Sequence, residues 1–133
     1  MVYITRRETF SASHRLFNPE LSDYRNDELF DKCNNIHGHN YILEVIVVGN
    51  IILETGYVVD LKILKNIISK TILEKVDHKH LNTDVDFLQG IIPTVENLCV
   101  AFWNQLVNKI PAGKLFSIKL SETENNFAEY RGE

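Results

Sequence analysis

The five histidines of this 133-residue chain lie in two parts of the sequence. His14, His37 and His39 flank a polar stretch in the first third of the chain, and His78 and His80 stand in the run DHKHLN. Residues two apart in an extended backbone project from the same face, so His37 and His39 can reach one ion. If the strand that ends at His14 is their neighbour, three neutral imidazoles meet. Such a set suits Zn²⁺ and leaves one coordination position for substrate, which is typical of a catalytic metal.

Cys33 precedes His37 by four residues, in the run CNNIHGH. Three interpretations stay open for it: a fourth ligand that closes a structural zinc site, a buried small side chain, or a thiolate that acts as base or nucleophile. Its polar neighbours argue against simple burial, but spacing does not separate a ligand from a base. Cys99 lies on a predicted apolar helix, and we expect it to pack in the core.

Two carboxylates could complete a reaction site. Asp77 precedes His78, and a carboxylate beside an imidazole can orient the ring and stabilise its charged form. Sequence neighbours point apart in a regular strand, so this pair needs an irregular backbone. Glu122, in the run KLSETENN, could accept two N–H bonds from the guanidine-like edge of a pterin or purine. The alternative for each carboxylate is a solvent-facing side chain.

Composition limits the classes of protein to which the chain can belong. Hydrophobic residues make up 44% and charged residues 24%, which is typical of one globular domain. The formal net charge is −4 and there is no basic tract, so neither nucleic acid nor a membrane surface is an expected partner. No apolar run approaches the roughly 20 residues of a membrane span. The N-terminal residues lack the apolar stretch of a signal peptide, and a cytoplasmic location is expected.

The elements that must position these residues follow from apolar spacing and turn signals. Alternating and β-branched residues predict strands at 2–12, 40–48, 57–59, 115–121 and 127–131. Apolar residues at helical spacing predict a helix that starts after Asp60 and another that starts after Thr94, each with that residue as N-cap. Residues 15–36 are polar and predict a long loop with one helical turn. The order of these elements predicts an α+β fold with an antiparallel sheet.

Six motifs, in order along nearly the whole chain, resemble one enzyme family. They are FSASHRL (10–16), C-x3-HGHNY (33–41), GYVVDL (56–61), DHKHLN (77–82), PTVEN (93–97) and SETENN…EYRGE (121–133). The chain resembles the 6-pyruvoyltetrahydropterin synthase and 6-carboxytetrahydropterin synthase family. This resemblance implies a single T-fold domain over 1–133, with a four-stranded antiparallel sheet and two helices. It also implies assembly into barrel-shaped trimers that stack as a homohexamer.

The resemblance further implies a small-molecule substrate, 7,8-dihydroneopterin triphosphate, and Zn²⁺ as cofactor. By position, the zinc ligands would be His14, His37 and His39, and Cys33 would move a proton on the substrate side chain. The remaining matches are a proton relay often supplied by an adjacent subunit (Asp77, His78), a pterin anchor (Glu122), and residues that line the pterin pocket (Thr94, Glu96).

The resemblance favours loss of triphosphate to give 6-pyruvoyltetrahydropterin. The alternative product is 6-carboxy-5,6,7,8-tetrahydropterin of the queuosine branch, formed with release of acetaldehyde, because the short C-x3-HGH spacing resembles that branch. Two more distant alternatives are a non-catalytic zinc module that Cys33 closes, and another T-fold pterin or purine enzyme of the aldolase type.

Overall fold

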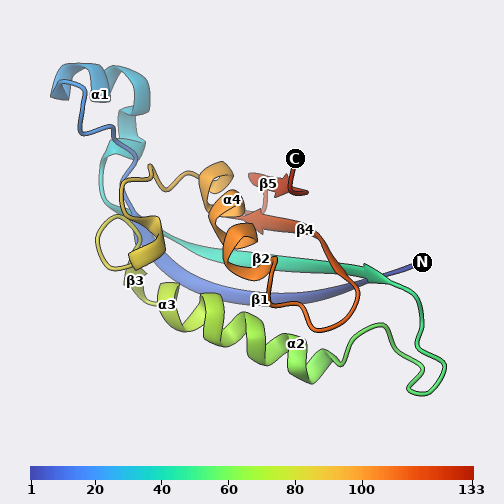
Figure 1. The fold of residues 1–133 in the computed structure, drawn as a ribbon. Helices are drawn as coiled ribbons and strands as arrows, with labels where there is room; N and C mark the ends of the chain where they lie inside the picture. The colour runs from blue at the N-terminus through green and yellow to red at the C-terminus, as the bar shows by residue number, and fades with distance from the viewer.

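A computed structural model describes residues 1–133, and its central feature is one twisted five-stranded sheet (Figure 1). Two long strands form its middle: β1 (Val2–His14) runs antiparallel to β2 (His37–Gly49). On the far side of β2 lie β4 (Lys114–Ser121) and then β5 (Phe127–Tyr130), both antiparallel to their neighbours. On the far side of β1 lies β3 (Lys79–His80), which pairs with it in parallel. The predicted α+β class is confirmed.

The two main helices start where their caps predict. The side chain of Asp60 accepts hydrogen bonds from the first-turn N–H groups of α2 (Leu61–Ile68), which continues through a π-helical turn (Ser69–Leu73) into α3 (Glu74–Val76). The Thr94 hydroxyl accepts from Asn97 N at the start of α4 (Val95–Leu106). Free N–H groups in the first turn of a helix need such acceptors, which makes the two starts readable from sequence.

Both helices cover the same face of the sheet. The core joins the buried side of α2 (Leu64, Ile68), the buried side of α4 (Leu98, Phe102, Leu106) and the inward residues of β1 and β2 (Phe10, Tyr41, Leu43, Val45). Alternate residues such as Ser11 and Asn40 point to the opposite face, which carries no helix. Cys99 is buried in this core, as predicted, and burial raises the pKa of its thiol to about 12.

Three details differ from the sequence-based expectations. Residues 57–59 form no strand; Val58 and Val59 are instead buried in the core, so their apolar character reflects packing. The sheet contains the four expected strands and gains β3, which is too short to be predicted from periodicity. The polar segment 15–36 contains more helix than the single turn expected, since α1 (Asp23–Phe30) has 8 residues and a 3₁₀ turn (Asp31–Asn34) follows it.

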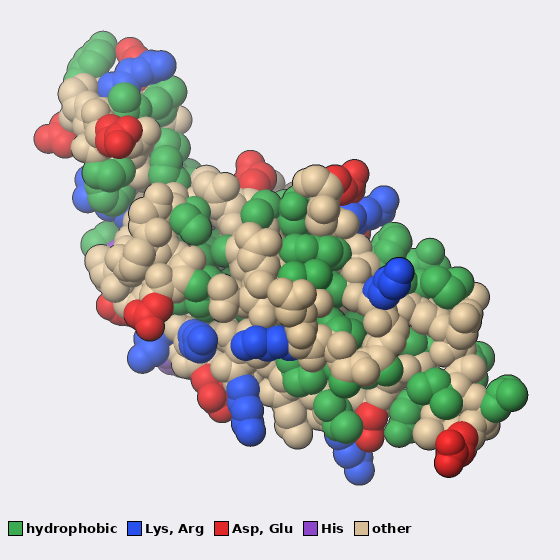
Figure 2. Space-filling model, in the orientation of Figure 1, with side chains coloured by type: hydrophobic (Ala, Val, Ile, Leu, Met, Phe, Trp, Pro, Cys, Tyr) green, Lys and Arg blue, Asp and Glu red, His purple; other side chains and the backbone are tan.

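The surface is mixed in charge and has one projecting part. Lys, Arg, Asp and Glu side chains are interspersed over the face drawn in Figure 2. The segment that contains α1 stands away from the body, beside the end of the sheet where β1 finishes and β2 begins (Figure 1). No helix combines the length and the apolar character that crossing a lipid bilayer would require.

Candidate active site and metal centre

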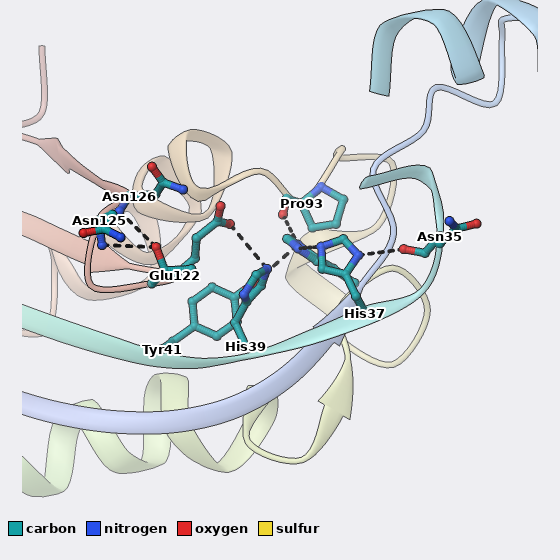
Figure 3. Close-up of polar contacts among 10 residues, drawn as sticks. Asn35, His37, His39, Tyr41, Pro93, Glu122, Asn125 and Asn126 are labelled. Carbon is teal, nitrogen blue, oxygen red and sulfur yellow. Dashed lines mark hydrogen bonds and ion pairs between the residues drawn. The ribbon is translucent and has the colours of Figure 1, made fainter. Parts of the chain in front are cut away.

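Three imidazoles meet at the end of the β1–β2 pair (Figure 3). The strand register places His14 opposite His37 and Ala12 opposite His39, so all three rings project from the same face. The Nε2 atoms of His14 and His37 are 3.0 Å apart, and ligand atoms of the three residues all lie within 4.8 Å of one another. The strand that ends at His14 is therefore the neighbour of the strand that carries His37 and His39, as a shared site requires.

Backbone carbonyls orient two of these rings. His14 Nδ1 donates to the Pro93 carbonyl at 2.8 Å, and His37 Nδ1 donates to the Asn35 carbonyl at 2.6 Å. A carbonyl oxygen only accepts, so Nδ1 carries the proton in both rings and the Nε2 lone pairs are left for a ligand. Metal-bound histidines are commonly held in this way through their second nitrogen. The sequence did not indicate Pro93 and Asn35 because both act through main-chain carbonyls, which do not depend on residue type. The one hint was that Pro93 is the first residue of the PTVEN motif.

Electrostatics keep the site in its ligand-binding form. Burial, together with the neighbouring imidazoles, lowers the pKa of His14 to about 4, against the opposing effect of the hydrogen bond to the Pro93 carbonyl. Burial also lowers the pKa of His39, against the opposing effect of Glu122. These rings are thus neutral at pH 7, as metal ligation requires. In tetrahedral zinc sites, nitrogens about 2.0–2.1 Å from the ion lie about 3.3 Å apart, so the donor types and spacing fit Zn²⁺.

Cys33 lies outside the group of three imidazoles. It belongs to the 3₁₀ turn before β2, its side chain is exposed, and its carbonyl accepts from Leu16 N at 2.8 Å. That hydrogen bond holds the turn beside the end of β1, which carries His14. The three imidazoles therefore form a set to which no sulfur belongs, the donor number of metal sites that keep one coordination position open.

Asp77 and His78 form the pair that an irregular backbone makes possible. Asp77 Oδ1 lies 3.0 Å from His78 Nδ1, and His78 has a φ of 61°, in the left-handed region. The segment is tied to β1 on both sides, because Ser11 N donates to Asp77 Oδ1 and His78 N donates to Ser11 O. A non-glycine residue seldom adopts this conformation, and such outliers gather at functional sites.

This pair does not belong to the group of three imidazoles in its own chain. His78 lines a cleft together with Ser11, Ser13 and Asn40. The side chains of Ser11, Ser13 and Asn40 alternate with those of the imidazole face along β1 and β2, so they point to the opposite face of the sheet, although the cleft is also bordered by Gly38 and His39. Within one chain, the Asp77–His78 pair and the three imidazoles therefore lie toward opposite faces of the sheet.

Glu122 does lie beside the imidazoles. It follows β4 directly, and its Oε2 is 3.9 Å from His39 Nε2 (Figure 3). Glu122 and Glu96 line one cleft, together with Asn125 and Asn126. Thr94 is at the same helix start, but its hydroxyl is engaged as the N-cap of α4. The structure therefore brings the predicted anchor together with one of its two predicted neighbours, and it places the anchor beside the three histidines.

Comparison with known proteins agrees with this arrangement. A family model described as 6-pyruvoyl tetrahydropterin synthase matches residues 3–133. The chain belongs to this family. Its members are lyases, and so is this pterin synthase homologue.

Individual relatives of this pterin synthase homologue carry two names. It is 46% identical to the 6-pyruvoyl tetrahydrobiopterin synthase of Dictyostelium discoideum, over 99% of this chain and 97% of the relative. It is 29% identical to a 6-carboxy-5,6,7,8-tetrahydropterin synthase of Rickettsia felis, over 97% and 99%. The structure of Caenorhabditis elegans 6-pyruvoyl tetrahydropterin synthase superposes with a TM-score of 0.93 at 37% identity, covering 99% of this chain and 96% of that one. The predicted T-fold is confirmed.

Proposed function

We propose that this chain is a zinc-dependent synthase that converts 7,8-dihydroneopterin triphosphate into 6-pyruvoyltetrahydropterin with loss of triphosphate. One observation carries the proposal: three imidazoles, two of which have Nε2 atoms left free by their Nδ1–H bonds, lie next to a carboxylate, Glu122, that suits the guanidine-like edge of a pterin. A site that holds both a pterin and a metal with an open position can act on the atoms between them.

The choice of product rests on two observations that favour different products. Identity to a relative named for the 6-pyruvoyl product is 46%, against 29% for one named for the 6-carboxy product, which favours 6-pyruvoyltetrahydropterin. The three-residue gap between Cys33 and His37 keeps 6-carboxy-5,6,7,8-tetrahydropterin as the second candidate.

Each side chain has a proposed role. Bound Zn²⁺ would be held by His14, His37 and His39, and would act as a Lewis acid toward the side-chain oxygens of the substrate. Glu122 accepts two N–H bonds from the pterin and thereby sets the position of the side chain, while Thr94 and Glu96 line the pterin pocket. The thiolate of Cys33 removes a proton from carbon, and triphosphate leaves as the carbon–oxygen bond breaks.

The proposed proton return requires an assembly. Asp77 and His78 lie on the face opposite the imidazoles, so we propose that an adjacent subunit supplies this pair to each metal site. The assembly would be a homohexamer, a dimer of trimers, with residues 1–133 as one T-fold domain in each subunit. We further propose that the enzyme works in the cytoplasm.

Product identification tests the proposal directly. Purified protein, stripped with a chelator and reloaded with zinc, is incubated with 7,8-dihydroneopterin triphosphate, and the pterin product is identified by mass spectrometry. We expect zinc-dependent release of triphosphate and a 6-pyruvoyl product. A 6-carboxy product together with acetaldehyde would support the second candidate, and no metal-dependent release of triphosphate would contradict both.

A matched pair of histidine variants controls for the metal site. His37→Ala removes a ligand, so bound zinc and turnover should both be lost. His80 lies outside the group of three, and His80→Ala should keep stoichiometric zinc. Equal loss of zinc in both variants would refute the three-histidine assignment.

A further inference from the structure

None of the residues assigned so far binds the triphosphate of the proposed substrate. With a formal net charge of −4, the chain as a whole repels such an anion, so local donors must supply the site. The substrate has a fixed order of pterin, hydroxylated side chain and triphosphate. Glu122, His39, His37 and Asn35 lie in this order across the site in Figure 3. A pterin at Glu122 with its side chain over the imidazoles therefore directs the triphosphate toward residues 33–36.

Arg15 stands at that end of the site and differs from every other arginine of the chain. The other four arginines each lie within 2.7 Å of a glutamate oxygen: Arg6, Arg7, Arg25 and Arg131. Arg15 forms no ion pair, although it directly follows the metal ligand His14 in the sequence. Its charge is therefore free to meet a ligand.

The Arg15 side chain is also held in place. Its Nε donates to the backbone oxygen of Asn34 at 2.7 Å and to Asn34 Oδ1 at 2.9 Å. Its Cζ lies 4.2 Å from the centre of the Phe17 ring. The main chain is fixed as well, because Arg15 N donates to Asn82 Oδ1 and Asn82 Nδ2 donates back to Arg15 O, both at 2.8 Å. The two terminal nitrogens keep unused donors in a fixed plane, the geometry that binds phosphate with two parallel bonds.

The surroundings decide which side of Arg15 an anion can reach. One adjoining cleft is also lined by Asp23 and Asp27 of α1, which repel phosphate. The other runs past Phe17 and Asn82, and its only acidic residue is Glu20. We propose that Arg15 binds the triphosphate of the substrate in this second cleft, as a substrate-binding residue of the active site. The inference rests on the proposed function for the identity of the ligand.

Binding of two unreactive ligands tests the inference without turnover. The zinc-loaded protein is titrated with neopterin triphosphate and with neopterin, and pterin fluorescence reports each Kd. We expect the triphosphate to strengthen binding to the wild-type protein by about 10- to 100-fold, the usual value of charge-assisted phosphate contacts. Arg15→Gln should abolish this gain and leave the Kd of neopterin unchanged. Arg25→Gln, which removes an exposed arginine in α1, should retain the full gain.

Arg15→Lys covers the case in which Arg15→Gln fails to fold. A lysine keeps the charge but lacks the planar fork, so we expect it to keep only part of the gain. A full gain in either Arg15 variant, or an equal weakening of both ligands, would overturn the inference. If the gain depends on Arg15 but the dihydro substrate is not turned over, the proposed function fails and the phosphate site stands. If turnover occurs and the gain does not depend on Arg15, only the phosphate site fails.

Discussion

His14 shows how burial prepares a single residue for metal binding. The side chain is fully buried, and its Nδ1–H is committed to the Pro93 carbonyl. Burial disfavours the charged imidazolium, so the ring stays neutral well below its ordinary pKa of 6.5. The same property makes the metal-free protein sensitive to acid, because protonation of the buried ring is unfavourable.

We predict that the metal-free protein loses stability as pH falls from about 6.5 to about 4. The folded-state pKa of His14 is about 4 and the ordinary value is 6.5, so the unfolded chain binds more protons within this window. Linkage then lowers the free energy of unfolding by about 2 kcal/mol between pH 7 and pH 5. Urea denaturation in chelator measures it. His14→Asn, which keeps a donor for the Pro93 carbonyl, should show a flatter pH profile, and an unchanged profile would contradict the assignment.

Replacement of Cys33 separates a catalytic thiol from a structural one. Cys33 is exposed and lies outside the three-histidine group, so Cys33→Ala should leave zinc content and melting temperature unchanged. Turnover should fall by at least about 100-fold, the usual contribution of a positioned proton-transfer group. Metal analysis and product assay on the same preparation give both values. A joint loss of zinc and stability would instead show a closed structural site.

At the scale of elements, the start of α4 connects a helix cap to the metal site. Thr94 caps the helix, and the carbonyl of the preceding Pro93 holds the His14 ring. Asn97 Nδ2 also donates to the Ile92 carbonyl at 2.9 Å, which closes the turn before the helix. Fraying of this helix start would therefore free the imidazole as well as the backbone.

We predict that two cap substitutions with similar effects on stability differ in their effect on zinc binding. Thr94→Ala and Asp60→Ala should each lower the free energy of unfolding by about 1 kcal/mol, the usual value of an N-cap side chain. Only Thr94→Ala should weaken zinc binding, because Asp60 caps α2, away from the imidazoles. Denaturation and competition with a chromophoric chelator measure the two effects. Equal zinc affinity in both variants would show that the cap does not hold the Pro93 carbonyl.

At the scale of the whole molecule, the sheet has unpaired edges on both sides. The strand β3 pairs with β1 only at Ala12 and Ser13, so the outer edge of β1 from residue 2 to residue 10 has no strand partner in the chain. At the other end, β5 has four residues and an open outer edge. Open edges of this length invite pairing with another copy. An assembly through these edges would also allow Asp77 and His78 of one subunit to approach the imidazoles of the next.

We predict that two inactive variants restore activity when they are mixed. If each site uses Cys33 from one subunit and His78 from another, random reassembly of Cys33→Ala with His78→Ala leaves roughly a quarter of the sites intact. The mixture, unfolded and refolded together, is assayed against each variant refolded alone. Light scattering should show the mass of an oligomer in all three samples. No recovered activity in mixed oligomers would place both residues in the same subunit's site.

Local signals in the sequence were enough to predict much of the fold. Asp60 and Thr94 marked both helix starts, because an N-cap acts on N–H groups only two or three residues away. The HGH spacing placed His37 and His39 on one face, since alternation is a property of any strand. The strand at 57–59 was wrong because burial of Val58 and Val59 gives the same apolar signal without strand pairing.

Tertiary structure alone decided how these parts combine. His14 meets His37 across 23 residues only because the β1–β2 register pairs them, and a shift of one residue would turn His14 to the other face. The Pro93 carbonyl reaches His14 from a segment 79 residues away, and main-chain acceptors leave no mark in residue type. The face on which Asp77 and His78 lie, and the position of Arg15 without an ion pair, likewise depend on contacts between distant segments. Residue type therefore determined which groups could do the chemistry, and packing determined which of them stand together.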